Sequence, residues 1–357
     1  MLAGLLWHDT QHSCAGGATA AIVLNAASIS FGYRGLMILP RTPAFPLPPI
    51  PATLAVAAAA WWITAGGLSL AGLIPLVGAA ALALAMRHLL IQLDAPQPDR
   101  AAALVFLLPC VLFGPYDAIW AAACVMALTD ALARRHPAML VWFGLAVGLD
   151  LQAAFVAPFF LALMINRHPP FRLWPIAPAV ASETMLVGWH PSDLATLYRM
   201  GIEQPLSFNA PNLWTIAQAL PLGVPLLGLA IAAAIGTSAA YIASFSARRL
   251  GDRTLMNAAL LASLVSAGLL PGMHANAFFL ADILALALAL VWRDTASWTI
   301  AILVQAGSVL AWLGALSGVP ALAMMGGVAM LVATFRLGRA LLKPAANDNP
   351  HLMRAIT

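Results

Sequence analysis

The stretch AMLVWFGLAVGLDLQAAFVAPFFLALMI, residues 138–165, decides the fold, because it is apolar throughout except for an acid and an amide at its middle. A helix needs about 20 apolar residues to cross the hydrocarbon core of a bilayer, and this stretch is longer. One continuous helix would bury Asp150 at the bilayer centre, which costs roughly 2.5–3.5 kcal/mol on insertion scales. We therefore predict a broken helical hairpin, in which two shorter helices meet at Gly148–Asp150 and the carboxylate lies at a membrane face.

The composition extends this interpretation to the whole chain. Hydrophobic residues make up 62% and charged residues 8% of the 357 residues, so lipid is the expected solvent for most of them. Apolar runs of this length indicate membrane-spanning helices, since an unpaired backbone is too costly in lipid. We expect an all-α, polytopic membrane helix bundle of about ten to twelve spans with short external loops. Besides the hairpin, spans are expected near residues 68–92, 101–114, 117–133, 173–189, 219–246, 254–270, 277–292, 296–314 and 318–340, with 51–66 either a span or an interfacial segment.

Three parts are expected along the chain. Residues 1–50 form an atypical amino-terminal segment, with a marginal span at 15–39 followed by a Pro-rich connection that is not helical. Residues 51–343 form the transmembrane bundle, and residues 344–357 form a cytoplasmic tail. The number and orientation of the spans before residue 68 stay open. The first residues lack the basic character of a signal peptide, so we expect no cleavage there.

The basic residues gather in turns that share one membrane face. This is the bias of cytoplasmic loops toward Lys and Arg, and it accounts for the net charge of +4. Because these residues separate apolar spans and do not alternate with exposed aromatics, we expect no nucleic-acid partner. The intervening turns carry carboxylates, His, Tyr, Asn and Gln, so we expect the chemistry at the external face. The turns of the basic face hold Arg87, Arg100, Arg134, Arg135, Arg167, Arg172, Arg248, Arg249, Arg253, Arg293, Arg336, Arg339, Lys343 and Arg354.

The first external turn, GPYDAIW (114–120), opens a predicted span with an acid in its first turn. There Asp117 meets the positive end of the helix dipole, so one interpretation is a helix cap. The other is a substrate ligand, which the neighbouring Tyr116 and Trp120 favour. Such aromatics also mark membrane interfaces without any catalytic role. Both interpretations stay open.

The stretch PGMHANAFFLADILALALAL (271–290) combines a histidine with an acid inside a span. His274, Phe278 and Asp282 are spaced by four, which predicts that they share a helix face. Asp282 is then expected about 12 Å deeper than His274, at 1.5 Å per residue. An ionisable group at such depth faces a polar cavity or a partner. The histidine either binds a phosphate or only marks the interface.

The longest polar loop covers residues 189–212. Its DLATLYRMG segment predicts a short amphipathic helix on the membrane, and Arg199 is the one basic residue of the loop. Asn209 and Asn212 follow beside a proline, which makes them turn residues first and ligands of sugar hydroxyls second.

No metal site is expected. Among His8, Asp9 and His12, the two histidines have the i, i+4 spacing of a metal-binding pair, but no third ligand is apparent. The three cysteines form no disulfide framework or metal-ligand spacing.

Four external signatures, in this order, resemble those of the GT-C membrane glycosyltransferases, in the branch of the GPI mannosyltransferase II proteins and their bacterial relatives. In that branch the turns read G-Q-x-D-x-x-W, F-K-x-Q-A-x-F-x-x-P-F, L-N-A-P-N-x-W and P-x-M-H-E-R-Y-x-F-x-A-D. This chain has GPYDAIW, LDLQAAFVAPF, SFNAPNLW and PGMHANAFFLAD. The similarity covers residues 100–292, and the order of the four motifs makes it fairly specific.

The resemblance implies a hexosyltransferase of the cell membrane, multi-pass and in the bacterial inner membrane. It moves a mannose-like hexose from a polyprenyl-phosphate donor to an extracytoplasmic glycan or lipid acceptor, among membrane lipids and without a further cofactor. A carboxylate deprotonates the acceptor hydroxyl. The candidate bases are Asp117, Asp150 and Asp9, and the candidate substrate ligands are Tyr116, Trp120, Gln152, Arg199, Asn209, Asn212, His274 and Asp282.

Three departures from the motifs bear on activity. Ala275 and Asn276 replace the Glu-Arg pair of the helix start, and Asp150 stands where the hairpin has a lysine. Asp9 is the sole acid before the Pro-rich connection, and it is cytoplasmic if 15–39 spans the bilayer.

A different class of protein stays open. Intramembrane Asp130, Glu183 and Asp282 fit a transporter or flippase for a lipid-linked sugar, or a non-catalytic protein on the same scaffold. A transporter predicts an internal inverted repeat, which we do not find in the sequence.

Overall fold

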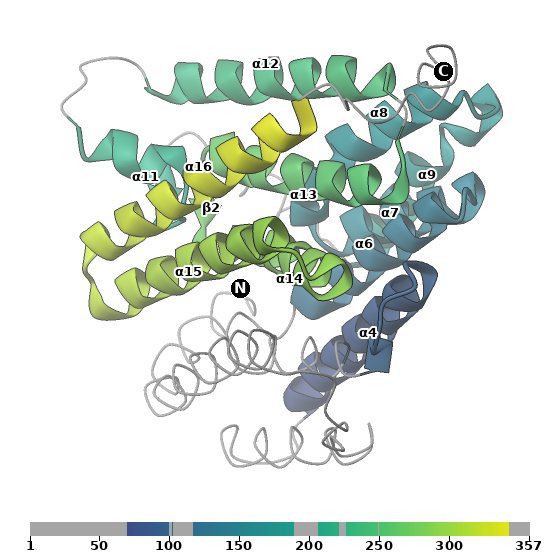
Figure 1. The fold of residues 1–357 in the computed structure, drawn as a ribbon, viewed down its shortest axis with the longest axis horizontal. Helices are drawn as coiled ribbons and strands as arrows, with labels where there is room; N and C mark the ends of the chain where they lie inside the picture. The colour runs from purple at the N-terminus through teal and green to yellow at the C-terminus, as the bar shows by residue number, and fades with distance from the viewer. Residues whose placement is uncertain are drawn as a thin grey trace, which may run out of the picture. The chain divides into compact units, whose positions relative to one another are not determined.

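A computed structural model describes residues 70–99, 102, 117–188, 206–220, 226–248 and 250–342. These residues are mostly helical, with two strands of two residues each (Figure 1). They belong to two compact units. The first unit comprises residues up to Asp150 together with Pro175–Met185, and the second comprises Leu151–Trp174 and the residues from Leu186 onward.

The first unit is built around the helix α6 (Asp117–Leu132), which packs on α4 (Leu70–Gln92) and on α7 (His136–Leu149). The connection from α6 to α7 is short, which makes the two helices antiparallel neighbours. It contains Arg134 in a left-handed conformation, with φ 58°. Arg135 lies there as well, and its Nη1 is 3.7 Å from Oδ1 of Asp130.

The predicted break of the long apolar stretch is confirmed. Helix α7 ends at Leu149, and Asp150 is extended, with φ −152° and ψ 134°. The chain continues as the 3-10 helix η1 (Leu151–Val156) and then as α8 (Ala157–Arg167). A carboxylate in the middle of an apolar run thus coincides with the end of a helix, which avoids its burial within one span.

Small residues bring α7 against α9 (Ile176–Gly188). A Cβ atom on Gly144 would collide with the carbonyl oxygen of Ala177, and one on Gly148 would collide with Thr184. Two glycines four residues apart on one helix face are a packing motif of membrane helices, since they let the backbones approach closely.

The second unit surrounds α13 (Asp252–Leu269). This helix contacts α8, η1, α11 (Leu213–Gln218), α12 (Leu226–Ser246), α14 (Phe279–Trp292), α16 (Pro320–Leu342) and the 3-10 helix η3 (Ala275–Phe278). Helices α15 (Thr295–Ser317) and α16 run side by side as a hairpin (Figure 1). Their turn contains Gly318 with φ 67°, the left-handed position that glycine favours after a helix. The remaining elements are η2 (Phe171–Leu173), β1 (Ser207–Phe208) and β2 (Met273–His274).

Within the described residues, four helices are long and apolar enough to cross a membrane: Leu226–Ser246, Ala275–Trp292, Thr295–Ser317 and Pro320–Leu342. They match four expected spans, although α12 begins at Leu226, later than predicted, and a separate short helix ends at Gln218. The chain is thus a helical membrane protein. The total of ten to twelve spans stays a prediction, and the expected spans 15–39, 51–66 and 101–114 lie outside the described residues.

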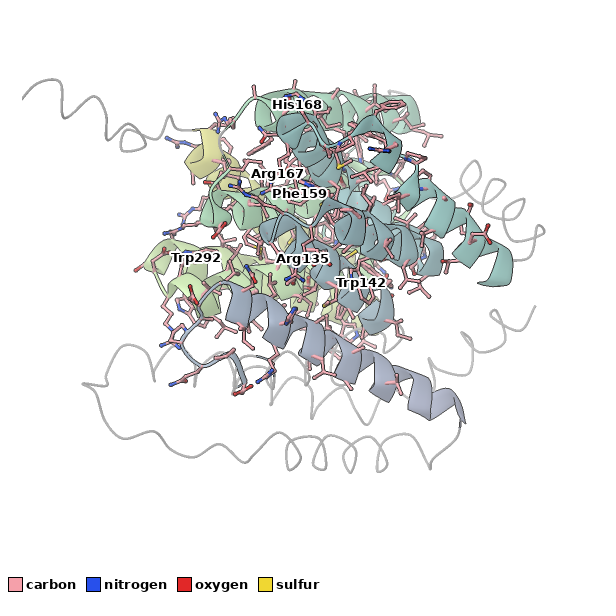
Figure 2. All side chains as sticks on the ribbon, turned by 90° about the vertical axis from the view of Figure 1, so that its right-hand side faces the viewer. Arg135, Trp142, Phe159, Arg167, His168 and Trp292 are labelled. Carbon is pink, nitrogen blue, oxygen red and sulfur yellow. The ribbon has the colours of Figure 1, made fainter. Side chains whose placement is uncertain are left out.

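One end of the second unit gathers the arginine-bearing turns, and we call it the arginine end. Asn166, near the end of α8, donates Nδ2 hydrogen bonds to the carbonyls of Ser246 (2.8 Å) and Arg248 (2.7 Å). Arg248 donates in turn to the carbonyl of Leu341. Figure 2 shows Arg167 and His168 at the end of α8, with Phe159 further inside the same helix. The ends of α8, α12 and α16 therefore meet, as the basic pattern predicts.

The start of α13 and the turn between α14 and α15 are joined in the same way. Arg253 forms an ion pair with Asp294 and lies over the ring of Trp292, 5.6 Å from its centroid. Since α13 begins beside Arg248, this pair brings the α14–α15 turn to the arginine end.

Candidate functional site

Two of the four external signatures pair with each other where α13 ends. Strands β1 and β2 are parallel, with Ser207 opposite Met273 and Phe208 opposite His274. Asn209 and His274 form a further bridge. We call the residues 206–215 and 270–278 the loop-pair site. Because α13 starts at the arginine end and finishes here, the loop-pair site lies at the opposite end of α13.

The local sequence explains how the two loops reach this arrangement. Asn209 has φ 56° and Gly272 has φ 75°, and Asn and Gly are the residues that adopt the left-handed region most readily. The backbone N–H of Gly272 donates to the carbonyl of Leu206 over 2.9 Å. Trp214 Nε1 donates to the carbonyl of Leu269 over 2.7 Å. The loop 206–214 is therefore fixed to the end of α13.

His274 stacks on an aromatic ring. The rings of Phe208 and His274 are nearly parallel, with centroids 4.6 Å apart and an interplanar angle of 11°. Although His274 is exposed, desolvation by the surrounding protein lowers the pKa of its imidazole, so the neutral ring persists to lower pH than in a free histidine. A neutral imidazole offers one donor and one acceptor to a ligand.

The structure corrects the prediction that His274 and Asp282 share a helix face. His274 is extended, with φ −101° and ψ 170°, and α14 begins only at Phe279. The pairing of β2 with β1 holds His274 out of the helix. The spacing of four therefore carries no helical geometry here, and the expected depth of about 12 Å below His274 does not follow from it.

Asn212 caps the short helix α11. Its Oδ1 accepts a hydrogen bond from the backbone N–H of Thr215 over 3.0 Å and from the Thr215 hydroxyl over 3.1 Å. The Thr215 hydroxyl is also 2.6 Å from the hydroxyl of Ser207. Asn212 is 1% exposed, and its Nδ2 has no hydrogen-bond partner among the described residues. Capping of α11 thus uses the oxygen of the Asn212 amide, whereas its Nδ2 donor is not used by the cap.

Two glycines of α16 support the same loop. A Cβ atom on Gly327 would lie 2.9 Å from the carbonyl oxygen of Asn212, and one on Gly326 would lie 3.3 Å from Cβ of Pro211. A side chain at position 327 would push the loop away, whereas one at position 326 would first collide with the carbonyl oxygen of Gly307 in α15. Gly327 therefore sets how closely the loop-pair site approaches α16.

Asp282 has the polar partner that its position predicts. It is in the first turn of α14 and 3% exposed, and its Oδ1 accepts a hydrogen bond from Ser308 of α15 over 2.9 Å. Gln305 Nε2 donates to the carbonyl of Asp282 over 3.0 Å. The carboxyl group thus joins α14 to α15 in the interior of the second unit.

Gln152 lies in η1, which packs against α13. Its side chain is partly buried, as expected for a residue between two apolar helices.

Asp117 and Asp150 belong to the first unit. Asp117 is in the first turn of α6 and 7% exposed, and its Oδ1 accepts a hydrogen bond from Trp120 Nε1 over 3.2 Å. Asp150 follows the last residue of α7. Since α6 and α7 are antiparallel, both acids lie at the end of this hairpin that is remote from Arg135. The position of Asp117 suits the dipole of α6, and the Trp120 contact fixes its carboxylate.

Three predicted site residues, Asp9, Tyr116 and Arg199, lie outside the described residues, as do His8 and His12. Among the residues that the structure describes, no three His, Cys, Asp or Glu side chains come close enough to hold a metal ion. The convergence of Asp117 with the loop-pair site stays a prediction.

Several residues that organise the site were not predicted from the sequence. Phe208 stacks on His274, and Gly326 and Gly327 of α16 lie against the loop 206–214. Ser308 donates a hydrogen bond to the carboxylate of Asp282, and Gln305 donates one to its backbone carbonyl. The glycine pair and these two polar residues each interrupt an expected apolar span, and that interruption was the signal available in the sequence.

A comparison of the sequence with protein-family models and with curated proteins gives no match.

Proposed function

We propose that this protein is a GT-C-type membrane hexosyltransferase, which transfers a mannose-like hexose from a polyprenyl-phosphate donor to an extracytoplasmic acceptor. The observation that carries the proposal is the loop-pair site. Two signatures far apart in the sequence pair in register and set Asn209 beside His274, at the end of α13 opposite the arginines.

The chemistry of these groups suits a sugar phosphate. The amide of Asn209 provides a donor and an acceptor for sugar hydroxyls, Asn212 provides its Nδ2 donor, and the neutral His274 provides one donor and one acceptor. Donors near the departing phosphate stabilise the charge that develops as the glycosidic bond breaks. On the acceptor side, Asp117 or Asp150 takes the hydroxyl proton, the oxygen attacks the anomeric carbon, and the lipid phosphate leaves from the opposite face.

A second candidate, a carrier of lipid-linked sugars, is favoured by one observation. Asp282 is buried in a candidate span and bonded to Ser308 of the next one. Buried acids in spans mark ion or proton paths in transporters. A carrier would bind the same donor without breaking its glycosidic bond.

The test incubates the purified full-length protein with radiolabelled polyprenyl-phosphate hexoses and a membrane lipid extract. We expect the label in an acceptor, with a loss of transfer in His274→Ala. His168→Ala is the matched control, because His168 is exposed at the arginine end and should transfer at the wild-type rate. Donor that binds to the protein but is never cleaved would contradict the transferase and favour the carrier.

A further inference from the structure

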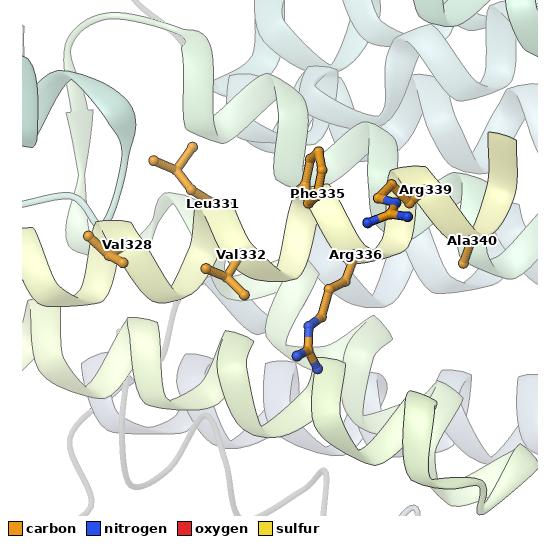
Figure 3. Close-up of a pocket in the computed structure, with 7 residues that line it drawn as sticks. All are labelled: Val328, Leu331, Val332, Phe335, Arg336, Arg339 and Ala340. Atoms are coloured by element: carbon orange, nitrogen blue, oxygen red, sulfur yellow. The ribbon is translucent and has the colours of Figure 1, made fainter.

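One face of α16 forms an apolar groove that ends in two arginines. Val328, Leu331, Val332, Phe335, Arg336 and Arg339 line a groove of about 610 Å³ (Figure 3). The intervals of three and four residues place these side chains along one stripe of the helix. Val328 is 53% exposed and Phe335 is 64% exposed, so no described part of the protein covers the stripe.

No carboxylate of the described residues neutralises the positive charge at the end of the stripe, since none lies within ion-pair distance of Arg336 or Arg339. The Arg339 guanidinium lies over the ring of Phe335, 5.6 Å from its centroid, which directs it along the stripe. Arg248 binds the carbonyl of Leu341 and so offsets the negative end of the α16 dipole. This end of the helix therefore attracts an anion.

The length of the stripe matches one leaflet of a bilayer. From Val328 to Arg339 the helix rises about 16 Å at 1.5 Å per residue. Half of a hydrocarbon core of about 30 Å is ~15 Å. An acyl chain beside the stripe thus has its phosphate at the level of the arginines. Arginine suits this position, because its planar guanidinium binds phosphate oxygens in pairs.

We propose that this stripe binds one anionic phospholipid, with its phosphate on Arg336 and Arg339 and an acyl chain along Val328, Val332 and Phe335. The lipid belongs to the leaflet at the arginine end, whereas the loop-pair site lies at the other end of α13. The lipid is therefore distinct from the sugar donor, and its binding does not depend on the proposed transfer.

The test titrates the full-length protein in detergent with phosphatidylglycerol or phosphatidylcholine and counts bound lipids by native mass spectrometry. We expect one phosphatidylglycerol to bind more tightly than phosphatidylcholine. The double variant Arg336→Gln and Arg339→Gln should weaken this binding by roughly tenfold to thirtyfold, since each basic residue near a membrane surface contributes roughly threefold to fivefold. Arg336→Lys with Arg339→Lys keeps the charge but not the paired donors, and should bind between the wild type and the Gln variant.

The matched control is Arg134→Gln with Arg172→Gln, which removes the same charge at two exposed arginines elsewhere. Circular dichroism and size exclusion check that each variant is folded. An equal loss in the control, or an unchanged preference in the Arg336 and Arg339 variant, overturns the proposal. So does displacement of the lipid by excess inorganic phosphate, because the apolar stripe would then contribute nothing. A wild-type protein without preference for phosphatidylglycerol overturns it too.

Discussion

Asp117 is the residue on which the proposed chemistry depends most. It is almost fully buried at the start of α6, and the indole N–H of Trp120 holds its carboxylate. The other acid of this hairpin end, Asp150, stands where the similar motifs carry a cation. A carboxylate there would repel the phosphate of the donor. Asp117 is therefore the better candidate for the base.

We predict that Asp117→Asn lowers the transfer rate by about 10²–10⁴, the usual effect of removing a general base. The protein should remain folded, because an amide oxygen still accepts the hydrogen bond from Trp120. The radiolabel assay measures the rate, and Asp99→Asn is the control, since Asp99 is exposed and paired with Arg87. Near wild-type transfer in both Asp117→Asn and Asp150→Asn would eliminate these bases and leave Asp9.

Among the contacts between elements, the close approach of α16 to the loop-pair site depends on the absence of a side chain at Gly327. We predict that Gly327→Ala destabilises the protein by about 1–3 kcal/mol, as overpacking does, and lowers transfer, because the new Cβ meets the carbonyl oxygen of Asn212. A Cβ atom on Gly338 in the same helix would have no neighbouring atom within 4 Å, so Gly338→Ala should be neutral or stabilising. Thermal unfolding in detergent compares them. Equal effects of the two variants would contradict the role of Gly327.

The helix cap of α15 gives a prediction for pH. Asp294 accepts a hydrogen bond from the backbone N–H of Ser297 over 2.7 Å and pairs with Arg253. Partial burial raises the pKa of Asp294, but the bonds from Ser297 and Arg253 outweigh burial and lower it. A lowered folded-state pKa stabilises the protein above the unfolded value of about 3.9, and this contribution is lost as the pH falls through the folded value.

Asp294→Ala should accordingly cost about 0.5–2 kcal/mol at pH 7, and the difference from wild type should shrink as the pH approaches 3. Thermal unfolding at several pH values measures both. Asp252→Ala is the control, because Asp252 is exposed in the first turn of α13. A difference that stays constant down to pH 3 would mean that the ionised cap contributes nothing.

Features that depend on neighbouring residues could be predicted from the sequence, whereas features that depend on contacts between distant residues could not. The break at Asp150 follows from the cost of a buried carboxylate, which depends on the sequence alone. The prediction that His274 lies on a helix face was wrong, because the conformation of His274 is set by its pairing with Phe208, a residue far away in the chain. The partner of Asp282 could be expected, but its identity as Ser308 depends on how α14 meets α15. Contacts of this non-local kind do not show in a periodicity.

Across the whole molecule, basic side chains and candidate site residues lie at opposite ends of the helices in each unit. In the second unit, the arginine end holds Arg248, Arg253 and the end of α16, and the loop-pair site lies at the other end of α13. In the first unit, Asp117 and Asp150 lie at the hairpin end remote from Arg135. From the bias of basic residues toward the cytoplasm, we predict that the arginines are cytoplasmic and the site residues external.

The most direct test of this claim is single-cysteine labelling with a membrane-impermeant maleimide on intact cells. Cys14, Cys110 and Cys124 are first replaced by serine, and one cysteine is then placed at Asp150, Asn276, Arg135 or Arg293. We predict that the cysteines at 150 and 276 react in intact cells, whereas those at 135 and 293 react only after permeabilisation. Labelling of 135 or 293 from outside, or protection of 150 until the cells are opened, would contradict the account.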